Sequence, residues 1–160
     1  MRKNSLLVAA GLALAVAIPS ATADATPPAD VEIVIETTIS DAGGSGPFFA
    51  FGPAVDDGVF CETGFSSDLP RTKSSGGNAQ GINLQVFKKL ECDDESGSVT
   101  LKLQVRIDRK GNNFNWNIVE GTGDYERLHG TGEGFGIFLG PNPEGNDQIL
   151  DILDGKMHID

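Results

Sequence analysis

The sequence of 160 residues has a formal net charge of −11, because 23 Asp and Glu residues outnumber 12 Lys and Arg residues. Such a surface repels phosphate backbones and anionic lipid headgroups, which argues against nucleic acid and acidic membranes as partners. Glycine occupies 21 positions, proline 8, and hydrophobic residues make up 39%. That composition excludes a helical bundle and a fully disordered chain, and the length suits one domain.

The first 23 residues have the pattern of a secretory signal peptide. Arg2 and Lys3 precede an apolar run from Leu6 to Ile18, and the small residues from Ala21 to Ala23 suit a signal peptidase. A membrane-spanning helix would need about 20 apolar residues, more than this run offers. We therefore expect cleavage after Ala23, a secreted protein in the extracellular space or periplasm, and no membrane attachment after cleavage.

A polar arm, residues 24–30, precedes the first predicted strand, Val31 to Thr38, which is rich in Val, Ile and Thr. Short apolar runs at 48–51 and 59–62 predict two further strands. The segment 71–78 is rich in serine and glycine and predicts a mobile loop.

The clearest predicted strand runs from Val99 to Asp108, where apolar and polar residues alternate strictly. Before it, alternation over 82–86 predicts a strand that is joined to it by a hairpin loop at 93–97. After it, a turn at 110–112 leads into a strand at 114–118. Three successive antiparallel strands follow from this pattern.

Glycines spaced through residues 121–140 argue against a helix there, since each costs up to about 1 kcal/mol relative to alanine. Alternating Phe135, Ile137 and Leu139 still predict a strand. A loop follows at 141–146, and 149–160 predicts one or two closing strands with a break near 154–155.

These seven to nine short strands fit a closed antiparallel barrel or a two-sheet sandwich. Interior glycines favour the barrel, because they permit the sharp coiling that closes a small sheet. We therefore predict an all-β protein with one barrel domain of about eight strands over 31–160.

The chain has two cysteines, Cys61 and Cys92. Outside the cytoplasm a lone pair forms a disulfide more often than a metal or redox site. Neither residue has a basic partner or a Cys-x-x-Cys spacing that would lower a thiol pKa. We predict that they are bonded to each other.

The stretch from Trp116 to Gly132 consists of a strand, a Gly-x-Gly turn, an aromatic residue and a second glycine-containing turn. It resembles the allene oxide cyclase-like and dirigent-like barrels, which belong with the calycin-type architectures. The similarity covers about 20 of the 160 residues. It implies an eight-stranded barrel, often with an apolar lumen and often assembled as a trimer, but supplies no catalytic residues.

Polar residues gather near these glycine-rich turns and are the candidate ligand-binding residues: Glu120, Tyr125, Arg127 and His129. Tyr125 could plug one end of the barrel, and Glu120 with His129 could do acid–base work if both faced one cavity.

No sequence pattern of a serine hydrolase, a phosphate-binding loop or a zinc site is present, so we predict no catalytic residue, metal or cofactor. The acidic runs at 56–57 and 93–95 are weak calcium candidates, because consecutive residues converge poorly on one ion.

Three hypotheses for function remain open. The first is a secreted, disulfide-bonded barrel that acts as a binding or structural module for a small apolar ligand. The second is an isomerase or cyclase whose barrel lumen shapes a reactive substrate. The third is an extracellular interaction protein whose interior is filled by its 9 Phe and other large side chains. A homo-oligomer is compatible with each.

Overall fold

The structure, a computed structural model, describes residues 25–70, 73–78, 81–108 and 111–160. Antiparallel strands dominate these ranges, and one short helix interrupts them. In chain order the elements are β1 (Ala29–Ser40), β2 (Gly43–Phe51), α1 (Pro53–Asp56), β3 (Thr63–Asp68), β4 (Lys73–Asn78), β5 (Gly81–Cys92), β6 (Gly97–Asp108), β7 (Gly111–Gly123), β8 (Leu128–Pro141) and β9 (Asp147–Ile159).

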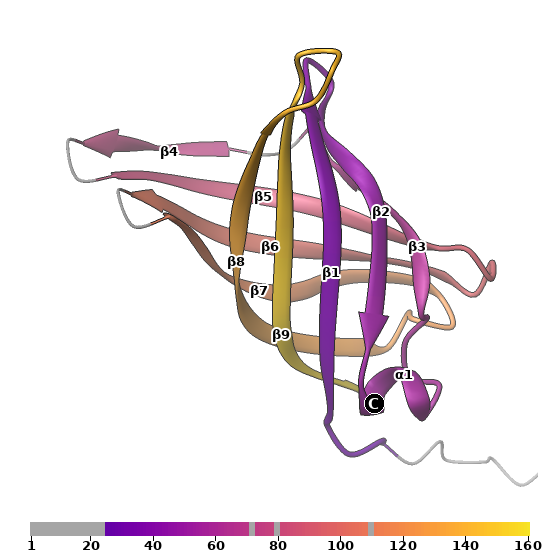
Figure 1. The fold of residues 1–160 in the computed structure, drawn as a ribbon. Coiled ribbons are helices and arrows are strands. Elements are labelled where there is room, and N and C mark those ends of the chain that lie inside the picture. The colour runs from indigo at the N-terminus through magenta and orange to yellow at the C-terminus, as the bar shows by residue number, and fades with distance from the viewer. Residues whose placement is uncertain (1–24, 71–72, 79–80, 109–110) are drawn as a thin grey trace, which may run out of the picture.

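The strands form one sheet that closes on itself (Figure 1). Chain neighbours pair from β5 to β9, β9 pairs with β1, and β1, β2 and β3 follow in order. Pairing of β3 with β5 completes the ring. The remaining strand, β4, pairs with the other half of the same edge of β5 and lies outside the ring. The predicted antiparallel barrel of eight strands is confirmed, and the sandwich alternative is wrong.

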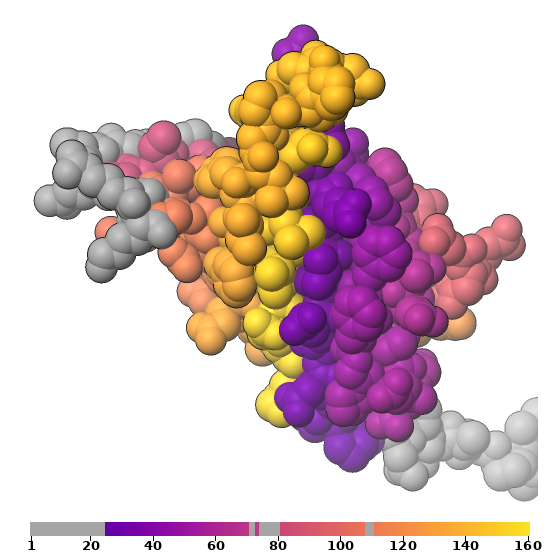
Figure 2. All heavy atoms as spheres, in the orientation of Figure 1, coloured from indigo at the N-terminus to yellow at the C-terminus, as the bar shows by residue number. Residues whose placement is uncertain are grey.

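Successive turns alternate between the two ends of the barrel. One end, which we call the mouth, includes the β1–β2 turn at 41–42 and the β8–β9 turn at 142–146. The orange β8–β9 turn projects at the top of the face shown in Figure 2, next to an indigo part of the chain. The opposite end, which we call the α1 end, includes α1 and the turns at 93–96 and 124–127. There the residues before β1 meet the end of β9, since Thr26 N–H donates to Ile159 O and Ile159 N–H donates to Thr26 Oγ1, both at 2.7 Å.

Large side chains fill the middle of the barrel because β8 presents glycines to them. Trp116 on β7 is paired with Gly132 on β8, and Phe114 with Gly134. A Cβ atom at Gly132 would lie 2.7 Å from the indole nitrogen of Trp116. That indole N–H donates to the carbonyl oxygens of Glu133 and Asp154, both at 3.2 Å. The buried core around this contact includes Ile33, Ile35, Phe48, Leu101 and Leu153.

The alternating residues Phe135, Ile137 and Leu139 lie in a strand, as predicted, but on its exposed side. Successive side chains of a strand point to opposite faces, so Gly134 and Gly136, which flank Phe135, face the core. The apolar pattern of β8 therefore marks the outer surface of the barrel rather than its interior.

Three predictions about elements were wrong: the strand at 59–62, the mobile loop at 71–78 and the break near 154–155. Residues 59–62 are not a strand, because Val59, Phe60 and Cys61 pack into the core after α1, and β3 begins at Thr63. The helix itself was not predicted; Pro53 at its first turn has the fixed backbone angle that suits a helix start.

The predicted mobile loop at 71–78 contains β4 over 73–78, while 71–72 lie outside the described residues. Hydrogen bonding to β5 needs only backbone groups, so a segment of serine and glycine can form this strand. The predicted break at 154–155 is also absent, because β9 is paired on both sides there, with β1 and with β8.

The predicted disulfide between Cys61 and Cys92 is confirmed. It joins the segment before β3 to the last residue of β5, beside the pairing that closes the barrel. The predicted signal peptide, 1–23, lies outside the described residues. Among those described, no helix has the length and apolar character needed to cross a membrane.

Candidate functional site

A cavity of about 250 Å³ lies inside the barrel near the mouth. Its walls are largely apolar and come from strands on several sides of the barrel. Phe138, which is 55% exposed, lies where the cavity approaches the surface. The other apolar residues of the wall are Ile39, Leu84, Val86, Leu103, Val105, Ile107, Phe114 and Ile149.

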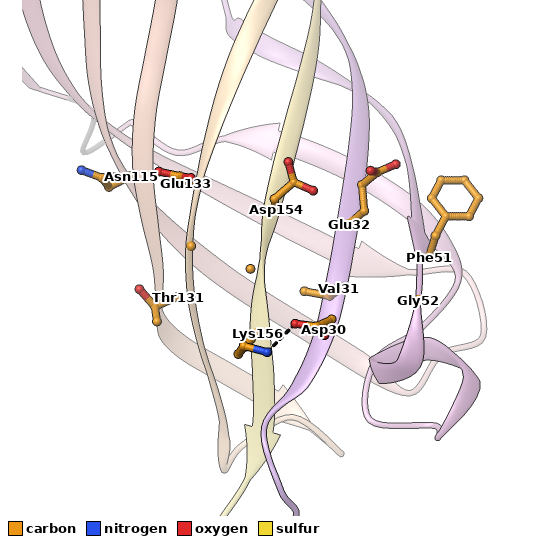
Figure 3. A pocket seen from close by; sticks show the side chains of 12 residues that line it. Asp30, Val31, Glu32, Phe51, Gly52, Asn115, Thr131, Glu133, Asp154 and Lys156 are labelled. Carbon is orange, nitrogen blue, oxygen red and sulfur yellow. Dashed lines mark hydrogen bonds and ion pairs between the residues drawn. The ribbon is translucent and has the colours of Figure 1, made fainter.

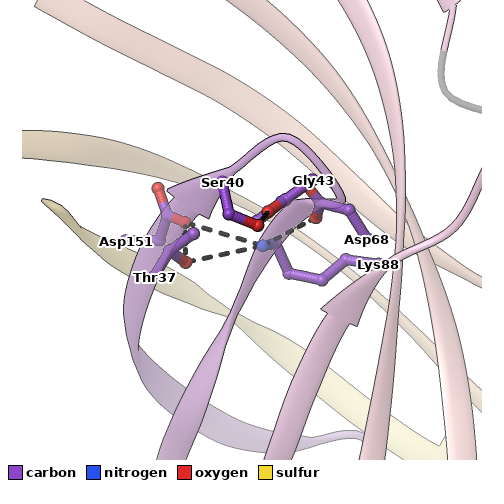
Figure 4. A network of polar contacts seen from close by, with 7 residues as sticks. Thr37, Ser40, Gly43, Asp68, Lys88 and Asp151 are labelled. Atoms are coloured by element: carbon purple, nitrogen blue, oxygen red, sulfur yellow. Dashed lines mark hydrogen bonds and ion pairs between the residues drawn. The ribbon is translucent and has the colours of Figure 1, made fainter. Parts of the chain in front are cut away.

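One side of this cavity carries a buried cluster of charged and polar side chains (Figure 4). The ammonium group of Lys88, whose side chain is only 4% exposed, lies 2.9 Å from Asp68 Oδ1 and 4.0 Å from Asp151 Oδ2. The same ammonium lies 3.5 Å from the hydroxyl oxygen of Thr37. We call Thr37, Asp68, Lys88 and Asp151 the mouth cluster. Four different strands, β1, β3, β5 and β9, contribute one residue each.

Strand alternation directs these side chains inward. Lys88 has the same parity on β5 as Val86 and Leu90. Asp151 likewise lies between Ile149 and Leu153 among the inward positions of β9. Lys88 and Asp151 therefore occupy positions on the core face of their strands where the flanking inward residues are apolar.

Hydrogen bonds hold both carboxylates in place. The Thr37 hydroxyl donates to Asp151 Oδ2 at 2.9 Å, and the Gly44 N–H donates to Asp68 Oδ2 at 3.0 Å. Burial raises the pKa of Asp151, and the positive charge of Lys88 and the bond from Thr37 offset only part of that effect. The carboxyl group of Asp151 thus retains its proton at a higher pH than a solvated aspartate does.

Asn112, the second residue of β7, also lines the cavity. It is only 7% exposed, and among the residues that the structure describes its side-chain oxygen Oδ1 has no hydrogen-bond partner. A buried acceptor without a donor is costly, so such a group in a folded protein calls for an explanation. Asn112 thus offers, beside the cavity, an acceptor that no described residue uses.

The predicted site residue Tyr125 lies at the α1 end, away from this cavity, and is buried. Its ring packs against Phe60 with ring centroids 5.4 Å apart. Its hydroxyl group lies 2.8 Å from Ser96 Oγ and 3.6 Å from Cys92 Sγ. Burial raises the pKa of Tyr125, so its hydroxyl remains protonated above the usual range.

The other predicted site residues lie on the outer surface. His129 stacks on His158 with ring centroids 5.4 Å apart, and its Nε2 atom lies 2.9 Å from Asp160 Oδ2. Glu120 and Arg127 are exposed. None of the four predicted residues lines the mouth cavity. Their role in ligand binding stays a prediction.

A larger hollow of about 770 Å³ lies on the outside of the barrel (Figure 3). Its charged side chains, Glu32, Glu133 and Asp154 among them, are exposed and spread over neighbouring strands. Lys156 is paired with Asp30 at one side. Water solvates and screens such groups, so they select a ligand less strongly than the buried mouth cluster does.

The molecule is thus a closed β-barrel with a small, mostly apolar internal cavity near its mouth and a buried charged cluster on the cavity wall. Comparisons with protein-family models, curated proteins and solved structures found no match. Inference about function therefore depends on the geometry of this site.

Proposed function

We propose that the protein binds a small, mostly apolar molecule in the mouth cavity. The observation that carries the proposal is the combination of an apolar wall with a few convergent, buried polar groups, which is typical of small-molecule sites. The cavity of about 250 Å³ suits a single-ring or short-chain compound. The filled core around Trp116 leaves this end of the interior as the place for a ligand.

The mouth cluster supports the same proposal. A buried lysine with two nearby carboxylates contributes little to folding stability compared with apolar side chains of similar volume. Its presence in an otherwise apolar barrel is more readily explained by recognition of a polar group. We infer that the cluster contacts the polar end of the ligand while the apolar wall holds its body.

The test is a titration of the purified protein with 2-phenylethanol, followed by two-dimensional NMR of backbone amides. We expect saturable shifts at residues around the cavity. The variant Val105→Phe fills the cavity and should abolish these shifts, whereas Val119→Phe adds the same volume on an exposed position and should leave them unchanged. Shifts confined to the outer surface, or equal binding by both variants, would contradict the proposal.

We also propose that the protein acts outside the cytoplasm and shares its ancestry with the allene oxide cyclase-like and dirigent-like barrels. The disulfide between Cys61 and Cys92 supports an oxidising compartment. The eight-stranded closed barrel supports the family resemblance. N-terminal sequencing of exported protein, expected to begin at Asp24, tests the first of these two proposals.

A further inference from the structure

We propose that the mouth cavity selects a primary amine with a small apolar body over the alcohol or the carboxylate of the same skeleton. This inference rests on the proposed function and names the chemical class of its ligand.

When both carboxyl groups are ionised, the charges of the mouth cluster do not balance. Two carboxyl groups, Asp68 and Asp151, face one ammonium group, Lys88. They are the titratable residues among the described residues that line the cavity. Lys88 lies 2.9 Å from Asp68 but 4.0 Å from Asp151, so Asp151 is the less compensated of the two. A second cation at this position would give two positive and two negative charges.

The acceptors on the cavity wall also favour a ligand that donates hydrogen bonds. Asp151, when ionised, can only accept hydrogen bonds, and the Oδ1 atom of Asn112 has no donor within the described part of the chain. Both residues lie against Gly136, where a Cβ atom would be 3.0 Å from Asp151 Oδ1 and 2.6 Å from Asn112 Nδ2. The terminal torsion of asparagine is broad, so its amide can turn its oxygen toward the cavity. An ammonium group brings three donors and no acceptor.

Burial supports this assignment. It raises the pKa of Asp151, which shows that a negative charge is poorly solvated there. A bound ammonium would stabilise the ionised carboxylate, whereas a bound carboxylate would add a third negative charge to the same site. The negative charge of the whole protein also attracts cations and repels anions.

The experiment compares 2-phenylethylamine, 2-phenylethanol and phenylacetate at neutral pH by calorimetry and amide NMR. We expect the amine to bind about tenfold more tightly than the alcohol, as one charge-assisted hydrogen bond implies. Phenylacetate should show no saturable binding. Equal affinity of amine and alcohol overturns the amine assignment and leaves the proposed function intact. Absence of binding by all three compounds overturns both.

Two variants test whether Asp151 is the source of the preference for the amine over the alcohol. Asp151→Asn keeps an acceptor for Thr37 but removes the charge, so the amine should lose about tenfold in affinity while the alcohol is unaffected. The matched control is Asp154→Asn, an exposed residue on the outer side of the same strand, which should change neither affinity. An equal loss in both variants would mean that the overall field, not the cavity, attracts the amine, and would overturn the proposal.

A second site variant covers the case in which Asp151→Asn does not fold. Asn112→Leu removes the unpaired acceptor from the cavity. We expect it to weaken binding of the amine severalfold while retaining a dispersed NMR spectrum. Undiminished amine affinity in this variant would contradict the assigned position of the ammonium group.

Discussion

Asp151 connects the folding of the barrel to the chemistry of its cavity. It is buried, accepts a hydrogen bond from Thr37 and lies 4.0 Å from the ammonium of Lys88. Ionising a carboxyl group in this buried position costs free energy that ionising a solvated aspartate does not. That cost has a measurable consequence for the pH dependence of stability.

Because burial raises the pKa of Asp151 in the folded state, the folded protein binds its proton more tightly than the unfolded chain does. The resulting stabilisation is present below the unfolded pKa of about 3.9 and is lost as the pH rises through the folded pKa. We expect wild-type protein to lose unfolding free energy relative to Asp151→Asn across this window. Urea unfolding at a series of pH values measures it, and parallel profiles would contradict the shift.

Gly132 is the second residue with a sharp prediction. In Gly132→Ala the new Cβ atom would lie 2.7 Å from the Trp116 indole nitrogen and closer still to the Asp154 carbonyl oxygen, so the backbone must move. We expect a loss of at least about 1–3 kcal/mol of unfolding free energy. Gly130→Ala on the same strand first meets the end of the Ile118 side chain at 2.9 Å, and should cost less. Chemical unfolding of both variants compares them; equal losses would argue against the indole contact.

The residues of the candidate site could have been located partly from alternation. Lys88 continues the inward parity of Leu84 and Val86, and Asp151 interrupts an apolar set on β9. A charged residue at a core-facing position was therefore the available signal. Strand pairing across the whole chain brings these residues together, and local pattern does not reveal it.

At the scale of elements, the disulfide secures the place where the barrel closes. β3 is among the shortest strands described, and its pairing with β5 completes the ring. The disulfide between Cys61 and Cys92, separated by 31 positions, joins the segment just before β3 to the end of β5 at one end of this pairing. The cross-link limits the freedom of the unfolded chain, which is the main source of disulfide stabilisation in the chain-entropy account.

We expect the double variant Cys61→Ser, Cys92→Ser to lose roughly 3–4 kcal/mol of unfolding free energy. The urea midpoint of the oxidised wild type, compared with that of the variant, measures the loss. Wild type treated with reductant serves as the control and should match the variant. An unchanged midpoint would show that strand pairing alone holds the closure.

Elements with strict alternation were predictable, and β6 is the clearest case. α1 was not, because one helical turn is too short to show a periodicity. β4 was not, because its serines and glycines give no apolar pattern and its pairing with β5 depends on the backbone. The continuity of β9 through Gly155 likewise depends on neighbours that are remote in sequence.

At the scale of the whole molecule, the barrel divides into a filled part and a small cavity. Trp116, Phe48 and their neighbours fill the middle, so the predicted apolar lumen is reduced to the space near the mouth. The predicted secretion and homo-oligomer formation stay predictions. Sedimentation of the purified protein would decide the oligomeric state.

The two hydrogen bonds between Thr26 and Ile159 have a consequence for the connectivity of the chain. Since these residues are adjacent in space, a short linker could join them, and new ends could be placed in the exposed β8–β9 turn between Pro143 and Glu144. We expect this circular permutant to fold with the same disulfide and a similar amide spectrum. Failure to fold would mean that the order of synthesis matters as well as the final pairing. Success would show that a ring of strands has no intrinsic first or last member.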